Sequence, residues 1–221
     1  DACLKYGPED IPENLADLPL TFHVHLPVDL PIRDDPSRAA AICLALLGKT
    51  VFLAQREENM GRRVPHLRGV LHPPAEYPGQ PGKASCELDV FIRTFQDMGG
   101  EPALLMLENI KENNLLRHME LALVHSMSIC LDLGHALAYR QFDLLTEDAL
   151  PQMLGMLHLN APGPASCPGR HLPLAALDER GRETAARLCS LLPPGKVIML
   201  ELFDWSHIKD SLPLLLSWLS Q

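Results

Sequence analysis

Six short apolar runs in this chain each end on a side chain that can bind a metal ion. Each run has the length of a buried strand, and its last residue is always His, Asp or Glu. The carboxyl ends of parallel strands share one edge of a sheet, so six such endings predict one charged site. The runs are 22–25, 70–72, 105–108, 129–132, 156–158 and 198–201, and they end at His25, His72, Glu108, Asp132, His158 and Glu201.

Segments with helical spacing of apolar residues alternate with these runs. Strand followed by helix, repeated along the chain, is typical of a parallel α/β sheet. We therefore predict an α/β fold of the (β/α) TIM-barrel type, built as a single domain over 1–221. The expected helices are 39–54, 87–98, 113–124, 146–154, 177–192 and 206–219.

A closed barrel of this type needs eight βα units, and the sequence offers six. The first 18 residues are acidic and contain proline, without a strand pattern. We expect either that two N-terminal strands are missing from this chain or that the barrel is incomplete. An open doubly wound sheet is the alternative fold, although its site usually draws on fewer strand ends.

Charge and composition restrict the partners. The net charge is −9, with 19 Lys and Arg against 28 Asp and Glu, which argues against a nucleic-acid partner because such a surface needs a basic groove. We expect a small-molecule substrate and, since no apolar run reaches 18 residues, no membrane span. The six cysteines form no CxxC pair and are expected to be reduced core residues of a cytoplasmic protein. The oligomeric state is left open.

Four of the strand-end residues form the strongest candidate metal site. Three carboxylates and one imidazole would repel one another if brought together without a cation. With a divalent cation they make a mixed oxygen and nitrogen ligand set. Zn, Mn or Fe(II) would suit such a site. Its members are Glu108, Asp132, His158 and Glu201.

A second candidate set consists of histidines near the same strand ends. His25 and His72 end strands, His135 follows Asp132 by three residues, and His171 lies in a loop rich in Pro and Gly. Asn109, Asn160 and Arg170 are candidate substrate-binding residues, because amides can orient ligands and a guanidinium fork matches two phosphate oxygens.

Short motifs around these residues resemble the xylose-isomerase-like TIM-barrel superfamily and, within it, the endonuclease-IV-like branch. The match runs from about Phe22 to Glu201. The matching motifs are Leu71-His72-Pro73, Leu107-Glu108-Asn109, the stretch Cys130-Leu131-Asp132-Leu133-Gly134-His135, His158-Leu159-Asn160 and Arg170-His171.

This resemblance implies two or three divalent metal ions. Glu108 would bridge two of them, with His25 and His72 on the first and Asp132, His158 and Glu201 on the second. His135 and His171 would hold a third. The chain departs from the branch at Gly169, where the loop carries an Asp in the family. The third site is therefore expected to be weak, empty or completed by another residue such as Asp178.

The additional histidines favour metal-dependent hydrolysis of a phosphodiester, with Glu108, His158 and Glu201 as the catalytic residues. The series is similar to CbiR-type cobamide-remodelling enzymes, which implies that the substrate is the nucleotide-loop phosphodiester of a cobamide. The alternative is a sugar or sugar-phosphate isomerase or epimerase, in which one ion on the quartet and two glutamates suffice. A barrel that binds a ligand without chemistry is a third, non-enzymatic possibility.

Overall fold

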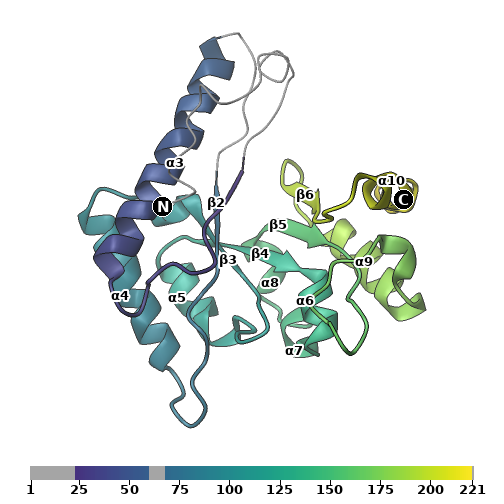
Figure 1. Cartoon of the computed structure of the whole chain (residues 1–221), viewed down its shortest axis with the longest axis horizontal. Coiled ribbons are helices and arrows are strands. Elements are labelled where there is room, and N and C mark those ends of the chain that lie inside the picture. Colours follow the sequence, from purple (N-terminus) through teal and green to yellow (C-terminus); the bar gives the residue numbers. More distant parts are fainter. Residues whose placement is uncertain (1–22, 60–67, 221) are drawn as a thin grey trace. The chain divides into compact units, whose positions relative to one another are not determined.

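The computed structural model describes residues 23–59 and 68–220, with side chains described outside 50–59. Six strands form one sheet in the order in which they occur in the chain (Figure 1). The pairings of β1 with β2, β4 with β5 and β5 with β6 are parallel. The strands are β1 (Val24–His25), β2 (Gly69–Leu71), β3 (Leu105–Glu108), β4 (Ser128–Asp132), β5 (Leu154–Leu159) and β6 (Val197–Leu200).

The chain divides into two compact units, and the boundary lies within β3, after Met106. The first unit extends to Met106 and includes Val124–Met127, and the second contains the remainder. The single domain expected over 1–221 stays a prediction.

In the first unit, two helices accompany the two-stranded pairing of β1 and β2. Helix α3 (Pro36–Asn59) packs against α4 (Lys83–Asp97) (Figure 1). The apolar residues of α4 at 88, 91, 92 and 95 are fully buried, as their helical spacing predicts. A chain reversal at Gly99, with φ of 90°, ends this helix.

In the second unit, β5 lies between β4 and β6, and all six of its residues are buried. Asp132 is paired in register with His158, and His158 with Met199. Helix α10 (Trp205–Leu219) packs against α9 (Glu179–Leu191) (Figure 1). The other helices of this unit are short: α5 (Met119–Val124), α6 (Leu133–Ala138), α7 (Phe142–Leu145) and α8 (Leu150–Met153).

Two of the expected helices are wrong over part of their length. In 113–124 only α5 is α-helical, because Leu115 has φ of 68° and the buried Asn113 bonds to the backbone of Leu115 and to His118. In 146–154 the chain forms α8 alone, and Leu154 already begins β5. The strand pattern therefore predicted boundaries better than the helical spacing did.

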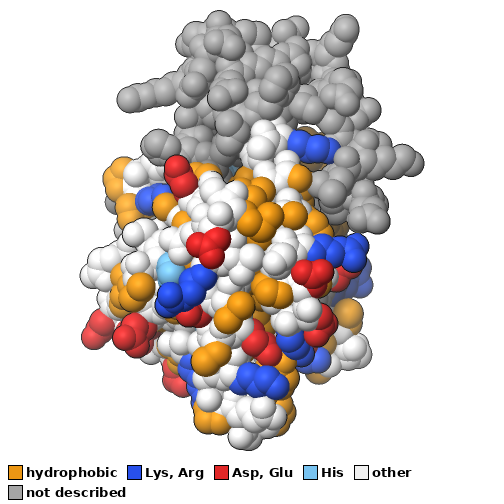
Figure 2. All heavy atoms as spheres, turned by 90° about the vertical axis from the view of Figure 1, so that its left-hand side faces the viewer, with side chains coloured by type: hydrophobic (Ala, Val, Ile, Leu, Met, Phe, Trp, Pro, Cys, Tyr) orange, Lys and Arg blue, Asp and Glu red, His pale blue; other side chains and the backbone are white. Residues whose placement is uncertain are grey.

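The segment 1–18 lies outside the described residues. No described helix is long and apolar enough to cross a membrane. On the face drawn in Figure 2, acidic and basic side chains are interspersed with apolar ones.

Candidate metal centre

The four residues of the predicted quartet come together in the second unit. Glu108 ends β3, Asp132 ends β4, His158 lies near the end of β5, and Glu201 follows β6. One ligand atom from each lies within 4.8 Å of the others. Parallel strands bring their carboxyl ends to one edge of the sheet. The four residues are far apart in the sequence and become neighbours only because the strands pair.

His158 lies between the two glutamates. Its Nδ1 is 2.9 Å from Oε1 of Glu108 and 3.0 Å from Oε2 of Glu201. His158 and Glu108 are both about 1 % exposed, whereas the Glu201 side chain is 13 % exposed. The site is therefore enclosed on the Glu108 side and more accessible at Glu201.

Asp132 is fixed by hydrogen bonds to both carboxylate oxygens. The backbone N–H of His135 donates to Oδ1 at 2.6 Å, and Nδ2 of Asn160 donates to Oδ2 at 2.9 Å. The first of these caps helix α6, which starts directly after β4. The Asp132 side chain thus has a defined orientation before any ligand binds.

Asn109 fixes the backbone of Asp132. Its Oδ1 accepts from the Asp132 N–H at 2.7 Å, and its Nδ2 donates to the Asp132 carbonyl at 2.9 Å and to Oε1 of Gln141 at 2.9 Å. The observed bonds show that Asn109 and Asn160 position Asp132 in the candidate metal centre. Direct substrate binding by either amide stays a prediction.

The quartet holds an unbalanced set of charges. Burial raises the pKa of Asp132 to about 7, and the neighbouring charges of Glu108 and Glu201 add to this rise. Burial would also raise the pKa of Glu201, but the hydrogen bond and charge of His158 outweigh it and hold that pKa at about 2. Burial alone would lower the pKa of His158, but contacts with Cys130, Glu108 and Glu201 outweigh it and raise that pKa.

These observations fit a divalent metal ion. Three carboxylates and one imidazole supply hard oxygen donors and one nitrogen donor, the mixture that Mn, Fe(II) and Zn accept. A cation would also compensate the carboxylate charges that burial now opposes. The residues present therefore suit the predicted ion.

A second group shares Asp132 with the quartet. Ligand atoms of Asp132, His135 and His171 lie within 4.8 Å of one another, and the two imidazole centroids are 5.6 Å apart. Nδ1 of His135 lies 2.9 Å from the Asn109 carbonyl, and Nδ1 of His171 lies 3.0 Å from the Glu201 carbonyl. Such contacts orient both rings and leave Nε2 of each as the natural ligand atom.

This arrangement clarifies the position of Gly169 and Asp178. The carboxylate of the second group is Asp132, while Asp178 caps helix α9 by accepting from the Gly181 N–H at 2.7 Å. A Cβ at Gly169 would lie 2.8 Å from the hydroxyl of Tyr139, so a larger residue there requires Tyr139 to move. Arg170, the predicted phosphate clamp, is exposed in the loop beside it.

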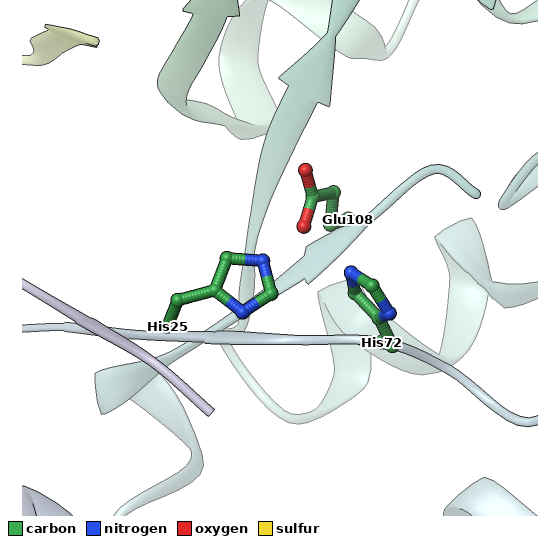
Figure 3. A group of neighbouring side chains, drawn as sticks. All are labelled: His25, His72 and Glu108. Carbon is green, nitrogen blue, oxygen red and sulfur yellow. The ribbon is translucent and has the colours of Figure 1, made fainter. Parts of the chain in front are cut away.

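In the first unit, His25 and His72 form a pair at the ends of neighbouring strands. Their ring centroids are 5.0 Å apart, with an interplanar angle of 83°. Figure 3 draws both imidazoles together with Glu108, the residue that the sequence predicts as their shared partner. A metal ion on the two histidines stays a prediction.

Comparison with known proteins supports the fold. No family model matches the chain, and no curated protein sequence matches it. A solved structure described as a D-tagatose 3-epimerase-like protein has a TM-score of 0.59 and 16 % identity, and the match covers 97 % of this chain and 84 % of that one. At this identity the likeness establishes the fold alone: a parallel α/β fold consistent with a partial TIM barrel, as the alternation of strands and helices predicted.

Several residues of the centre were not predicted as members. Cys130 lies beside His158 and Glu108, Gln141 supports Asn109, and Tyr139 flanks His135 with centroids 5.8 Å apart. Cys130 had a visible signal, because it precedes Asp132 by two residues on the same strand face. Gln141 and Tyr139 had none, because both follow the short helix α6, which the sequence pattern did not reveal.

Gly134 is predicted to tolerate no side chain. A Cβ there would overlap Oδ1 of Asn160 and lie 2.6 Å from its Cγ, and Asn160 is the amide that holds Asp132. We expect Gly134→Ala to lower the free energy of unfolding by about 1–3 kcal/mol and to weaken metal binding. Thermal denaturation and metal titration would measure both.

Gly48→Ala is the matched control for that substitution. Gly48 lies within α3, and among the described residues no atom beyond the adjoining helix backbone lies within 4 Å of the point that a Cβ would occupy. Alanine there should therefore stabilise the helix by up to about 1 kcal/mol. Wild-type stability and metal affinity in Gly134→Ala would contradict the proposed contact.

Proposed function

We propose that this chain is a metal-dependent isomerase or epimerase that acts on a small polyhydroxylated carbonyl compound, a sugar or a sugar phosphate. The observation that carries this proposal is the buried quartet, in which Glu108 and Glu201 lie on either side of His158 with Asp132 beside them. The epimerase-like description of the structural neighbour agrees with it. This was the alternative interpretation of the sequence, and it now has more support than phosphodiester hydrolysis.

The quartet would hold the ion, which when bound supplies Lewis-acid polarisation of the substrate's oxygens. Two glutamates in one site provide a base and an acid for the carbon next to a carbonyl. One carboxylate removes the C–H proton, and the electron pair of that bond moves toward the carbonyl oxygen. The other carboxylate returns a proton, to the opposite face for epimerisation or to the neighbouring carbon for isomerisation.

The rest of the site orients these groups. Asn109 and Asn160 fix Asp132, and the greater exposure of Glu201 makes its side of the quartet the more accessible one. The low exposure of Glu108 and His158 excludes water from the other side, which strengthens electrostatic interactions there.

Proton exchange with solvent tests this proposal. Metal-loaded protein would be incubated in D₂O with a panel of ketopentoses, ketohexoses and their phosphates, and the products followed by NMR and mass spectrometry. We expect one substrate to gain deuterium at the carbon beside its carbonyl and to form an epimer or an aldose. Absence of exchange across the panel, with metal bound, would contradict the proposal.

Phosphodiester hydrolysis is the second candidate, and one specific observation favours it. The Asp132, His135 and His171 group offers a further ligand set beside the quartet, which a one-metal isomerase does not need. The finer form of this hypothesis is cleavage of the nucleotide-loop phosphodiester of a cobamide, with His25 and His72 completing another ion site.

Metal stoichiometry and product analysis separate the two candidates. One tightly bound ion per chain, with sugar turnover, favours the isomerase. Two or three ions, with release of the lower-ligand nucleoside from a coenzyme-form cobamide, favour the phosphodiesterase. Elemental analysis of purified protein and chromatography of the corrinoid products would provide these readouts.

A further inference from the structure

We propose that Gln141 positions Asp132 for metal binding, acting through the side-chain amide of Asn109. The inference rests on the metal quartet of the proposed function, to which Asp132 contributes one carboxylate. Gln141 would touch neither substrate nor ion, so it is a positioning residue and not a catalytic one.

The end of helix α6 places Gln141 beside Asn109. Arg140 has φ of 57°, and this left-handed residue reverses the chain directly after the helix. The N–H of Gln141 then donates to the carbonyl of Ala136 at 2.9 Å, and the N–H of Arg140 donates to that of Leu137 at 3.4 Å. These two bonds are the pair that closes a helix in a Schellman motif. Gln141 is 6 % exposed, so its amide has to find its partners inside the protein.

Two side-chain amides join Asp132 to Ile110. Oδ1 of Asn109 accepts from the Asp132 N–H at 2.7 Å, while Nδ2 of Asn109 donates to the Asp132 carbonyl at 2.9 Å. The second proton on this nitrogen goes to Oε1 of Gln141, also at 2.9 Å. Nε2 of Gln141 in turn donates to the Ile110 carbonyl at 2.7 Å. The bonds form an unbroken chain from one backbone segment to the other.

Backbone groups at both ends fix the direction of this chain. A backbone N–H can only donate and a carbonyl can only accept, so Asp132 requires the oxygen of Asn109 at one position and its nitrogen at the other. Turning the Gln141 amide over would place two nitrogen donors together and would set its oxygen against the Ile110 carbonyl. Gln141 therefore favours the same orientation of Asn109 that Asp132 requires. Its removal would leave a buried Nδ2 proton of Asn109 and the Ile110 carbonyl without these partners.

Asp132 is the ligand on which such support has the largest effect. It ends β4, and its carboxylate belongs both to the quartet and to the group with His135 and His171. The position of its backbone determines where both carboxylate oxygens lie relative to the other ligands. Groups that orient a metal ligand typically change metal affinity by about 10- to 100-fold.

Co²⁺ titrations of three variants test this role. Gln141→Met keeps the length of the side chain but removes its amide, and we expect it to weaken Co²⁺ binding by about 10- to 100-fold. In Gln141→Glu the introduced carboxyl can donate to the Ile110 carbonyl only when it is protonated. Its affinity should therefore match the wild type at acidic pH and fall below it as the carboxyl ionises. Gln152→Met, at an exposed position of α8, is the control and should match the wild type.

Hydrogen exchange in the metal-free protein measures the positioning directly. The Asp132 N–H donates to Asn109, so its exchange rate, followed by NMR, reports this bond. We expect it to exchange about 10-fold faster in Gln141→Met than in the wild type, and at the wild-type rate in Gln152→Met. In the wild type itself, both Nδ2 protons of Asn109 should be protected from exchange. That measurement needs no variant, so it decides the matter even if Gln141→Met fails to fold.

The possible failures are distinguishable. Equal Co²⁺ affinity and equal Asp132 exchange in Gln141→Met and the wild type would overturn the inference and leave the metal centre intact. A loss in Gln141→Glu that equals the loss in Gln141→Met at every pH would also overturn it, because Gln141 would then only fill space. A wild-type protein that binds no Co²⁺ would overturn the proposed function, while the exchange rates would still decide whether Gln141 positions Asp132.

Discussion

Replacing Glu108 by Gln is expected to abolish turnover while the protein stays folded. Glutamine keeps the size of the side chain and can still meet Nδ1 of His158, which Oε1 of Glu108 contacts at 2.9 Å. It removes both a charged oxygen ligand and a proton acceptor. General acid–base groups contribute about 10²- to 10⁴-fold to rates, so we expect a loss of at least that size.

Comparison with Glu201→Gln sharpens this prediction. If the two glutamates act on opposite faces of one carbon, a variant that keeps metal but lacks one of them should exchange deuterium into one epimer and not the other. Metal content must be measured in parallel, because both residues are also candidate ligands. Glu183→Gln on the exposed face of α9 is the control and should retain wild-type activity.

Two outcomes would contradict the assignment. Full turnover in Glu108→Gln would remove this carboxylate from the mechanism. Equal deuterium exchange into both epimers in each variant would exclude a two-base mechanism and would leave the quartet with a binding role alone.

The metal-free protein is expected to lose stability as the pH rises from about 4 to about 7. The pKa of Asp132 is 3.8 when unfolded and about 7 when folded, because burial opposes its charge. Between these values the folded state binds more protons than the unfolded state, so the free energy of unfolding falls with rising pH. Three pKa units correspond to about 4 kcal/mol.

Glu201 contributes with the opposite sign at lower pH. Its pKa is about 2 when folded against 4.5 when unfolded, so its stabilisation is complete above 4.5 and is lost as the pH falls through 2. The two carboxylates together predict a stability maximum for the metal-free protein at about pH 4–5.

Asp132→Asn isolates the contribution of Asp132. An amide cannot ionise, and Asn160 can offer Oδ1 to it after a flip, since that atom has no hydrogen-bond partner among the described residues. In urea denaturation from pH 4 to 8, the free energy of unfolding of this variant should therefore lack the decline that Asp132 causes in the wild type. The exposed Asp143→Asn variant should follow the wild type.

Addition of metal provides an independent test of whether burial opposes the ionisation of Asp132. A divalent ion favours ionised Asp132, so Mn²⁺ should stabilise the wild-type protein more at pH 7 than at pH 5. A flat stability profile for the metal-free protein, or equal stabilisation by Mn²⁺ at both values, would contradict an uncompensated carboxylate at this position.

The ends of some helices follow from local sequence, whereas the conformation of one segment does not. Gly99 ends α4 as its local chemistry predicts, and Asp204 caps α10 by accepting from the Ser206 N–H at 2.8 Å. The segment 113–118 has helical spacing but is held out of an α-helix by the buried bonds of Asn113. Such bonds join residues whose pairing depends on tertiary burial, so periodicity does not reveal them.

The sequence by itself determined the strands and which candidate ligand residues lie together at their ends. Each apolar run has to be buried, and a polar residue at its end lies at the edge of the sheet. The alternation of runs and helices predicts parallel strands, whose ends share one edge. This was sufficient to place Glu108, Asp132, His158 and Glu201 together. The quartet could be predicted in this way, residue by residue, whereas the sequence did not reveal that Asp132 also lies beside His135 and His171.

Only the tertiary structure decided how those ligands are held. Asn109 binds the backbone of Asp132, 23 positions along the chain, Gly134 leaves space for Asn160, and Cys130 lies beside His158. These relations depend on register and on distances of a few ångströms between neighbouring strands. The local sequence specifies on which face of the sheet a side chain lies. The packing of neighbouring strands specifies which atoms that side chain contacts.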